Sequence, residues 1–215
     1  MRAVILAGGD LQVTPRVLER LRGVDLVVAA DGGARHAPTL GLCVDLWVGD
    51  FDSSQGLEAG LITDLANVPR EGHPVDKNQV DTELALLAAR SRGATEALVI
   101  GAFGGRFDHA LTVATVALRN TLAGFRIDLE SGSETGWSLV PGRDLTLALE
   151  PGTTFSVIAL GSVAAGLTVT GAKWPLERTD LPFGFGWGVS NVALGPVRCS
   201  LEAGMALIVV QFRSV

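Results

Sequence analysis

The stretch from Asp25 to Gly33 reads DLVVAADGG, an apolar run that ends abruptly in an acidic, glycine-rich turn. Near-continuous apolarity over this length is typical of a strand that is covered on both faces of a parallel sheet. In an open parallel sheet, ligands bind beyond the carboxyl ends of the strands. The sequence therefore predicts a buried strand over residues 25–30 and a candidate site at Asp31, Gly32 and Gly33.

The same alternation of strand and turn continues through the first half of the chain. Apolar runs alternate with stretches of helical spacing as far as about Leu129, which is how βαβ units appear in a sequence. Further strands are predicted over residues 3–7, 46–48 and 97–100, and helices over residues 15–21, 33–40, 80–89 and 107–118. We therefore expect a Rossmann-like parallel α/β domain over residues 1–130.

The second part of the chain has a different pattern, in which short alternating stretches are divided by glycine and proline turns. Strands are predicted over residues 145–149, 154–160, 167–170 and 206–212. Residues 130–136 read ESGSETG, a polar run that we interpret as a flexible hinge. The expected fold class is α/β, with the N-terminal Rossmann-like domain followed by a C-terminal all-β domain over residues 131–215, a sandwich or a barrel by its pattern, of which the family resemblance described below implies the sandwich.

Composition and charge narrow the class of protein. The chain has 215 residues and is 47% apolar, enough for a large core, and its net charge of −6 gives no basic field for nucleic acid. The two cysteines, Cys43 and Cys199, form no CxxC pair, so a reducing cytoplasm is expected. No apolar run approaches the length of a membrane span or of a signal peptide's core, so we expect no membrane association.

Two carboxylates follow the predicted strand at residues 46–48. Asp50 and Asp52 stand two apart in the motif Gly-Asp-Phe-Asp-Ser, so in an extended segment both face the same side. Carboxylate oxygens placed in this way can share a hard cation, for which Mg²⁺ is the natural choice. The alternative is a turn or a helix cap, and the motif taken alone favours that alternative.

Another polar cluster follows the predicted strand at residues 97–100. Gly104, Gly105 and Arg106 could cradle a phosphate through backbone N–H groups and a guanidinium fork at a helix N-terminus. Asp108 could bind metal or only complement the helix dipole. His109 could act as a general base or as a structural hydrogen-bonding residue.

The segment from Lys77 to Glu83 opens a predicted helix. Lys77 could contact a phosphate and Asp81 could supply a further carboxylate, although helix capping and dipole stabilisation explain the acidic residues equally well. The chain has no GxxxxGK[ST] phosphate loop, no GxGxxG fingerprint and no GxSxG elbow. The two best-known nucleotide signatures and a serine hydrolase are therefore excluded.

The order of these motifs is more specific than any one of them. The chain reads ADGGA at 30–34, GDFDS at 49–53, KxxxDxExA at 77–85 and GGRxDH at 104–109. This series closely resembles the thiamine pyrophosphokinase family, and the resemblance continues in Lys173-Trp174-Pro175-Leu176 and Ser190-Asn191. It implies Mg²⁺-dependent transfer of the diphosphate of ATP to the hydroxyl of thiamine with release of AMP, in a homodimer whose active sites lie between subunits.

The resemblance also implies roles for individual residues. Asp50, Asp52 and Asp81 would hold Mg²⁺ and the triphosphate, Arg106 and Asp108 would complete the catalytic site, and Trp174, Ser190 and Asn191 would bind thiamine. The nucleotide would further contact Asp31, Gly32, Gly33, Lys77, Gly104, Gly105 and His109. A cationic thiazolium favours aromatic faces, which Trp174 or Trp187 can supply, although both rings could equally fill a core or a dimer interface.

Two departures from the family pattern leave alternatives open. The family usually reads Lys-Asp-x-Thr-Asp where this chain has Asn78 and Val80, and bacterial members often have Glu where Val192 stands. The alternatives are a diphosphokinase for another hydroxyalkyl heterocycle and a catalytically reduced nucleotide-binding module. Whether Asp81 or Asp108 accepts the hydroxyl proton is also open.

Overall fold

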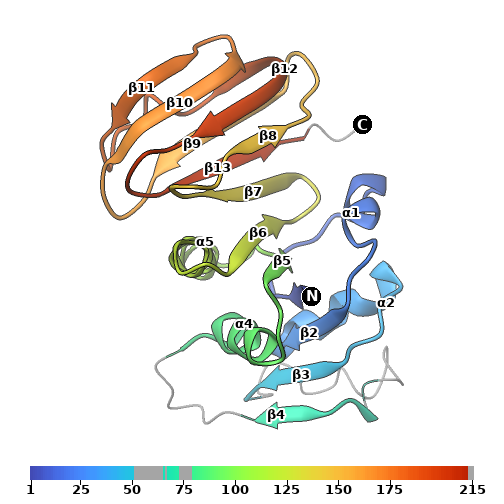
Figure 1. Ribbon diagram of the computed structural model, residues 1–215. Coiled ribbons are helices and arrows are strands. Elements are labelled where there is room, and N and C mark those ends of the chain that lie inside the picture. Colours follow the sequence, from blue (N-terminus) through green and yellow to red (C-terminus); the bar gives the residue numbers. More distant parts are fainter. Residues whose placement is uncertain (51–64, 66, 73–78, 213–215) are drawn as a thin grey trace. The chain divides into compact units, whose positions relative to one another are not determined.

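A computed structural model describes residues 1–50, 65, 67–72 and 79–212 (Figure 1). The chain divides into two compact units. One contains Met1–Val116 and Leu129–Gly132, and the other contains Ala117–Asp128 and Ser133–Val215. No helix in the described part of the chain is long and apolar enough to cross a membrane.

The first unit is built on parallel strands. Its elements are β1 (Arg2–Leu6), α1 (Pro15–Arg20), β2 (Leu26–Ala30), the 3₁₀ helix η1 (Asp31–His36), α2 (Ala37–Leu40), β3 (Leu46–Gly49), β4 (Arg70–Gly72), α4 (Asp81–Ser91), β5 (Glu96–Ile100) and the start of α5 (Phe107–Leu122). The strands pair in the order β5, β1, β2, β3, β4, and every pair is parallel. The predicted strands at 3–7, 25–30, 46–48 and 97–100 are confirmed.

The apolar strand residues account for the core of this unit. Leu6 pairs with Ala29 on one side and with Ile100 on the other, and all three are buried. Helix α4 packs against β1, β2 and β3. Full burial of a leucine or isoleucine side chain contributes about 1.5–3 kcal/mol, so these strands are held mainly by packing. Helix α1 begins after Thr14, whose hydroxyl accepts a hydrogen bond from the Val17 N–H at 3.2 Å, as expected of an N-cap.

The strand order also determines where a ligand can bind. The chain proceeds from β1 to β4 in one direction and then places β5 on the opposite side of β1. Such a reversal opens a crevice at the carboxyl ends of the two strands where it occurs, which here are β1 and β5. The turns after these strands are therefore the expected edge of a site.

The second unit is built on antiparallel strands. Its elements are the end of α5, β7 (Glu134–Leu139), β8 (Leu145–Leu147), β9 (Thr154–Ala159), β10 (Ala164–Ala172), β11 (Leu176–Leu181), β12 (Asn191–Ser200) and β13 (Ala206–Gln211). Strand β6 (Arg126–Glu130) crosses the division between the units. The long strand β12 pairs with β9 through Asn191–Val192 and with β8 and β10 further along. Phe155, Leu167, Val197 and Ile208 lie in the core of this unit.

Residues 130–136 differ from their predicted structure. Residues 130–136 were expected to form a flexible hinge, and this prediction is wrong, because the stretch contains the end of β6 and the start of β7. Glu130, Ser131 and Thr135 are at most 4% exposed. The polar composition suggested a hinge. Glu130 is nevertheless buried, because it is ion-paired to Arg16 and Arg20, which lie far away in the sequence.

The mixed α/β class is confirmed. The finer division into a Rossmann-like domain over residues 1–130 and a β-sandwich over residues 131–215 stays a prediction. Helices were predicted close to their observed positions at α1, α4 and α5, whereas the expected helix over 33–40 is a 3₁₀ turn followed by one α-helical turn.

Candidate active site

Three carboxylates meet at the ends of the parallel strands. Asp31 follows β2, Asp50 follows β3, and Asp81 is the first residue of α4. Each offers a carboxylate oxygen within 4.8 Å of the other two. A magnesium ion with ligands at about 2.1 Å holds neighbouring oxygens about 3 Å apart, so a small inward movement of these side chains would produce a suitable ligand set.

This cluster differs in one member from the predicted metal set. Asp50 and Asp81 were expected in it, whereas Asp31 was expected only as a nucleotide contact. Asp52 and Lys77 lie outside the described residues. Asp31 has a φ of +41°, and a non-glycine residue in this left-handed region is strained, a condition that is concentrated at functional sites.

Two turns border the crevice between β1 and β5, and they are hydrogen-bonded to each other. In the turn Gly8–Asp10, the Asp10 N–H donates to the Phe103 carbonyl at 2.9 Å. The Asp10 carboxylate accepts in return from the Gly105 N–H at 3.1 Å. Gly104 has a φ of +77°, and a Cβ there would collide with the Asp10 carboxylate, so only glycine fits.

Arg35 and His36 hold the Gly8–Asp10 turn from the other side. The Arg35 guanidinium donates to the carbonyls of Gly8 at 2.5 Å and Gly9 at 3.0 Å. His36 Nε2 lies 2.9 Å from the Gly9 carbonyl, and because a carbonyl only accepts, Nε2 carries the proton. Burial lowers the pKa of His36, so its ring is neutral at pH 7 and acts here as a support for the turn.

The three carboxylates and parts of these turns line a hollow of about 470 Å³ in the first unit. This volume is in the range of small-molecule sites. It brings together most of the predicted nucleotide and metal residues, namely Asp31, Gly32, Asp50, Asp81, Gly104, Arg106 and His109. The lining also includes four functional candidates that the sequence reasoning missed, namely Gly8, Gly9, Arg35 and Thr82. Gly8 and Gly9 could have been found, since they directly follow a predicted strand in the same way as Asp31 and Gly32.

Three of the predicted nucleotide and metal residues that the structure describes are absent from this lining, and each has another contact or packing role. The Gly105 N–H bonds to Asp10, and a Cβ on Gly33 would collide with the Leu6 carbonyl, so Gly33 permits close packing of the chain. The third is Asp108, which is bound by Arg106 through two hydrogen bonds of 3.2 and 2.6 Å.

The pairing with Arg106 decides the chemistry of Asp108. Its hydrogen bond to the guanidinium holds the pKa of the Asp108 carboxyl below its usual value, with a smaller contribution from the His109 N–H. A carboxylate stabilised in its ionised form is a weaker proton acceptor. Asp108 is therefore poorly suited to act as the base.

A second, mainly apolar hollow of about 470 Å³ lies in the second unit. The three predicted thiamine residues, Trp174, Ser190 and Asn191, all line it, and so does Trp187. The indole rings of Trp174 and Trp187 are 53% and 46% exposed, so neither fills a core. Ser190 has a φ of +63°, a second strained residue at the edge of a candidate site.

The side chain of Asn191 is occupied by the backbone of Trp174. Its Nδ2 donates to the Trp174 carbonyl at 2.7 Å, and its Oδ1 accepts from the Trp174 N–H at 3.2 Å and from the Val192 N–H at 2.8 Å. The Lys173 ammonium lies 4.6 Å from the centroid of the Trp174 ring, a cation–π contact. Asn191 therefore orients Trp174.

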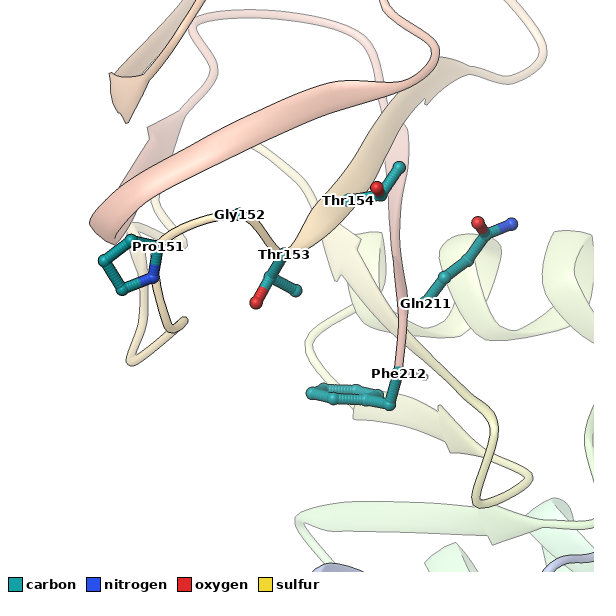
Figure 2. Close-up of a pocket in the computed structure, with 6 residues that line it drawn as sticks. All are labelled: Pro151, Gly152, Thr153, Thr154, Gln211 and Phe212. Carbon is teal, nitrogen blue, oxygen red and sulfur yellow. The ribbon is translucent and has the colours of Figure 1, made fainter. Parts of the chain in front are cut away.

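A third hollow, of about 630 Å³, is formed by Pro151–Thr154 and Gln211–Phe212 in the second unit. In Figure 2 the side chains of Thr153 and Phe212, which lie just outside β9 and β13, point to one side, whereas those of Thr154 and Gln211 point to the other. None of the described residues that line it carries a charge, so they supply neither a carboxylate for a cation nor a cationic contact for phosphate.

Clustered carboxylates beside glycine turns and an arginine, at the carboxyl ends of parallel strands, are typical of α/β proteins that bind a metal-complexed nucleotide. Residues 18–128 match the family model of the thiamin pyrophosphokinase catalytic domain, and residues 144–206 match that of the thiamin pyrophosphokinase vitamin B1 binding domain. The chain belongs to the thiamin pyrophosphokinase family.

Individual relatives agree with this assignment. Thiamine pyrophosphokinase 1 of rice is 28% identical over 156 residues, which are 69% of this chain and 58% of the rice protein. The crystal structure of thiamine pyrophosphokinase from Bacillus subtilis matches with a TM-score of 0.83 and 22% identity over the whole of both chains, which shows a shared fold. A thiamin pyrophosphokinase family protein from Enterococcus faecalis matches with a TM-score of 0.78 and 25% identity, again over both full chains. The family resemblance predicted from the motifs is confirmed.

Proposed function

We propose that this chain is an ATP:thiamine diphosphotransferase, which forms thiamine diphosphate and AMP. The observation that carries the proposal is the meeting of Asp31, Asp50 and Asp81 beside Arg106 in one hollow. We further propose that residues 1–130 are a Rossmann-like ATP-binding catalytic domain and residues 131–215 a β-sandwich thiamine-binding domain. The parallel strand order and the vitamin B1 binding match over residues 144–206 support this division.

The residues of the first hollow suit a magnesium complex of ATP. Asp31, Asp50 and Asp81 would hold Mg²⁺, together with Asp52, which shares the Gly-Asp-Phe-Asp-Ser motif with Asp50. The bound ion would offset charge on the phosphates. The guanidinium groups of Arg35 and Arg106 line the same hollow and would contact phosphate oxygens.

The acceptor hydroxyl needs a group that can take its proton. Both carboxylates considered for this role are weak bases, because Asp108 is paired with Arg106 and Asp81 belongs to the proposed Mg²⁺ set. Positioning of the hydroxyl toward the β-phosphorus should supply most of the acceleration, as is usual in phosphoryl transfer.

The second hollow suits thiamine. The exposed rings of Trp174 and Trp187 offer aromatic faces to a flat, cationic heterocycle. We propose that Ser190 contributes a hydroxyl and that Asn191 acts through Trp174. The free thiols of Cys43 and Cys199 are consistent with a cytoplasmic location.

A homodimer with active sites at the subunit interface is part of the proposal. Its support is the set of large apolar side chains between residues 174 and 194 that stand at least 46% exposed, namely Trp174, Phe183, Phe185, Trp187, Val189 and Leu194. Apolar surface of this kind is common at protein interfaces.

The test is AMP release from ATP and Mg²⁺ with and without thiamine, with detection of the product by mass. Thiamine-dependent AMP and a mass gain of one diphosphate would support the proposal. AMP formed only with another hydroxyalkyl heterocycle would change the acceptor. ATP binding without AMP formation for any acceptor would leave a nucleotide-binding module and contradict the proposal.

A further inference from the structure

We infer that Thr82 and the N-terminus of α4 form a binding subsite for a phosphate oxygen. Thr82 lies in the first turn of α4, next to Asp81, and lines the same hollow as the three carboxylates. The inference rests on the proposed function to the extent that the phosphate belongs to ATP.

Among the described residues, the N-cap position of α4 has no side chain that satisfies the helix N-terminus. The N-cap position is Val80, an apolar residue with extended backbone that provides no side-chain hydrogen bond. The Glu83 N–H bonds back to the Val80 carbonyl at 2.9 Å, whereas the N–H of Thr82, at the second helical position, has no acceptor inside the helix. An uncapped N-terminus of an 11-residue helix carries partial positive charge and favours an anion.

The hydroxyl of Thr82 is an independent sign of a ligand. Thr82 is 1% exposed, and within the described part of the chain its Oγ1 has no hydrogen-bond partner. An unpaired buried hydroxyl destabilises a protein, and valine would fill the same space without that penalty. A bound oxygen acceptor would satisfy the hydroxyl.

The chemistry of the surroundings identifies the ligand as an oxyanion. The hydroxyl and the amide of Thr82 are both hydrogen-bond donors, so they would bind an acceptor. A phosphate oxygen that also coordinates a cation held by Asp31, Asp50 and Asp81 is such an acceptor, and it is negatively charged. A neutral acceptor would use the hydroxyl but gain little from the helix N-terminus.

The test is the isosteric variant Thr82→Val, studied without thiamine so that no turnover occurs. Binding of Mg²⁺·ATP and of Mg²⁺ with inorganic diphosphate is measured by calorimetry, and the unfolding free energy is measured in urea. We expect binding of both ligands to weaken about tenfold, as for loss of one hydrogen bond to a charged group. We expect the unliganded variant to be at least as stable as the natural protein.

Two further variants serve as controls. Thr82→Ser keeps the hydroxyl and should restore the affinity to within about twofold of the natural protein. Thr115→Val removes an exposed hydroxyl of α5, which donates to the Thr112 carbonyl, and should leave both affinities unchanged.

Several outcomes would overturn the inference. Unchanged affinity in Thr82→Val would show that the hydroxyl does not meet the ligand. A less stable or unfolded Thr82→Val protein would show that the hydroxyl is satisfied within the fold. If the natural protein binds Mg²⁺·ATP but makes no thiamine diphosphate, the proposed function fails. The affinities of the natural protein and Thr82→Val then still decide whether Thr82 binds a phosphate oxygen. If it binds neither ligand, both ideas fail.

Discussion

Asn191 is a residue whose contacts assign it an indirect role. Both ends of its amide bind backbone groups of Trp174 and Val192, and this leaves the indole of Trp174 held at the edge of the second hollow. A side chain used in this way influences a ligand by orienting the residue that touches it.

We expect Asn191→Ala to raise the KM for thiamine by up to about 30-fold, because loss of the two bonds to Trp174 costs roughly 1 kcal/mol each. Turnover at saturating thiamine should change little. In a Trp174→Ala background the same substitution should add almost nothing, which a double-mutant cycle of KM values will measure. Additive effects of the two substitutions would instead mean that Asn191 binds thiamine itself.

His36 predicts a pH dependence of stability. Burial lowers the pKa of His36 in the folded protein relative to its usual value of 6.5, so the unfolded chain binds a proton more readily. The unfolding free energy should therefore fall as the pH drops below about 6.5. Urea unfolding at pH 7.5 and 5.5 measures the difference, which should shrink in His36→Gln. A His109→Gln protein retains His36 and should keep the larger difference, and equal slopes in both variants would contradict this role.

At the level of elements, the strand β6 depends on charges that lie far away in the sequence. Glu130, at its end, is fully buried and is bound by Arg16 at 2.7 Å and Arg20 at 2.8 Å, both on α1. Burial by itself would raise the pKa of Glu130, but the bonds from Arg16 and the Gly132 N–H, and the arginine charges, bring it below the usual value. Its contribution to stability is present above about pH 4.5 and is lost as the pH falls through the lower folded pKa.

We expect Glu130→Gln to lower the unfolding free energy at pH 7 by about 3 kcal/mol, because two arginines lose a buried partner. Urea unfolding checks this. The matched control is Glu19→Gln, which breaks the exposed Glu19–Arg22 pair and should cost less than about 0.5 kcal/mol. Similar losses in the two variants would show that the Glu130 network contributes no more than a surface pair.

The strands β6, β7 and β12 were missed by the sequence reasoning for two physical reasons. In β6 and β7 the polar residues are satisfied by distant partners, as for Glu130 with Arg16 and for Asp128 with Arg143, so the local composition resembled a linker. In β12 the pair Gly195-Pro196 weakens the strand signal, and around it the strand exchanges its partner β9 for β8, while β10 pairs with it on both sides. Buried apolar strands such as β1 and β2 could be predicted because their signal is local.

On the scale of the whole molecule, the first hollow joins residues from most of the first unit. Its position could be predicted, since parallel strands bring their carboxyl ends to one edge. Not all of the residues that line it could be predicted. Asp31 turns toward the other carboxylates only through a left-handed backbone, and Thr82 matters only because its buried hydroxyl has no partner among the residues that the structure describes. Neither property can be read from residue type or spacing.

We expect Asp50→Asn to reduce turnover at saturating ATP and thiamine by about 10²–10³-fold, since loss of one electrostatic contact at such a site costs roughly 3 kcal/mol. Steady-state AMP release measures this, and the thermal unfolding temperature should stay near that of the natural protein. Near-normal turnover would remove Asp50 from the proposed metal set. Asp45→Asn serves as the control, because Asp45 caps the Val27 N–H away from the hollow and is expected to affect stability only.

The proposed homodimer predicts a solution mass of twice the 22.4 kDa chain, measured by light scattering. Phe185→Ser, which removes a 59% exposed aromatic ring, should weaken self-association because apolar area leaves the interface. Leu18→Ser on α1 removes a 44% exposed apolar side chain outside the predicted sandwich domain and should leave the mass unchanged. A monomeric natural protein would contradict the prediction.

The left-handed backbone at Asp31 has a consequence for laboratory evolution. A glycine would adopt a φ of +41° without strain, so Asp31→Gly should relieve the backbone while it deletes a carboxylate from the hollow. A library selected only for heat resistance would therefore enrich variants that have lost this acidic side chain. Selection for a supply of the enzyme's product would remove the same variants, so the two selections would move the sequence in opposite directions at this position.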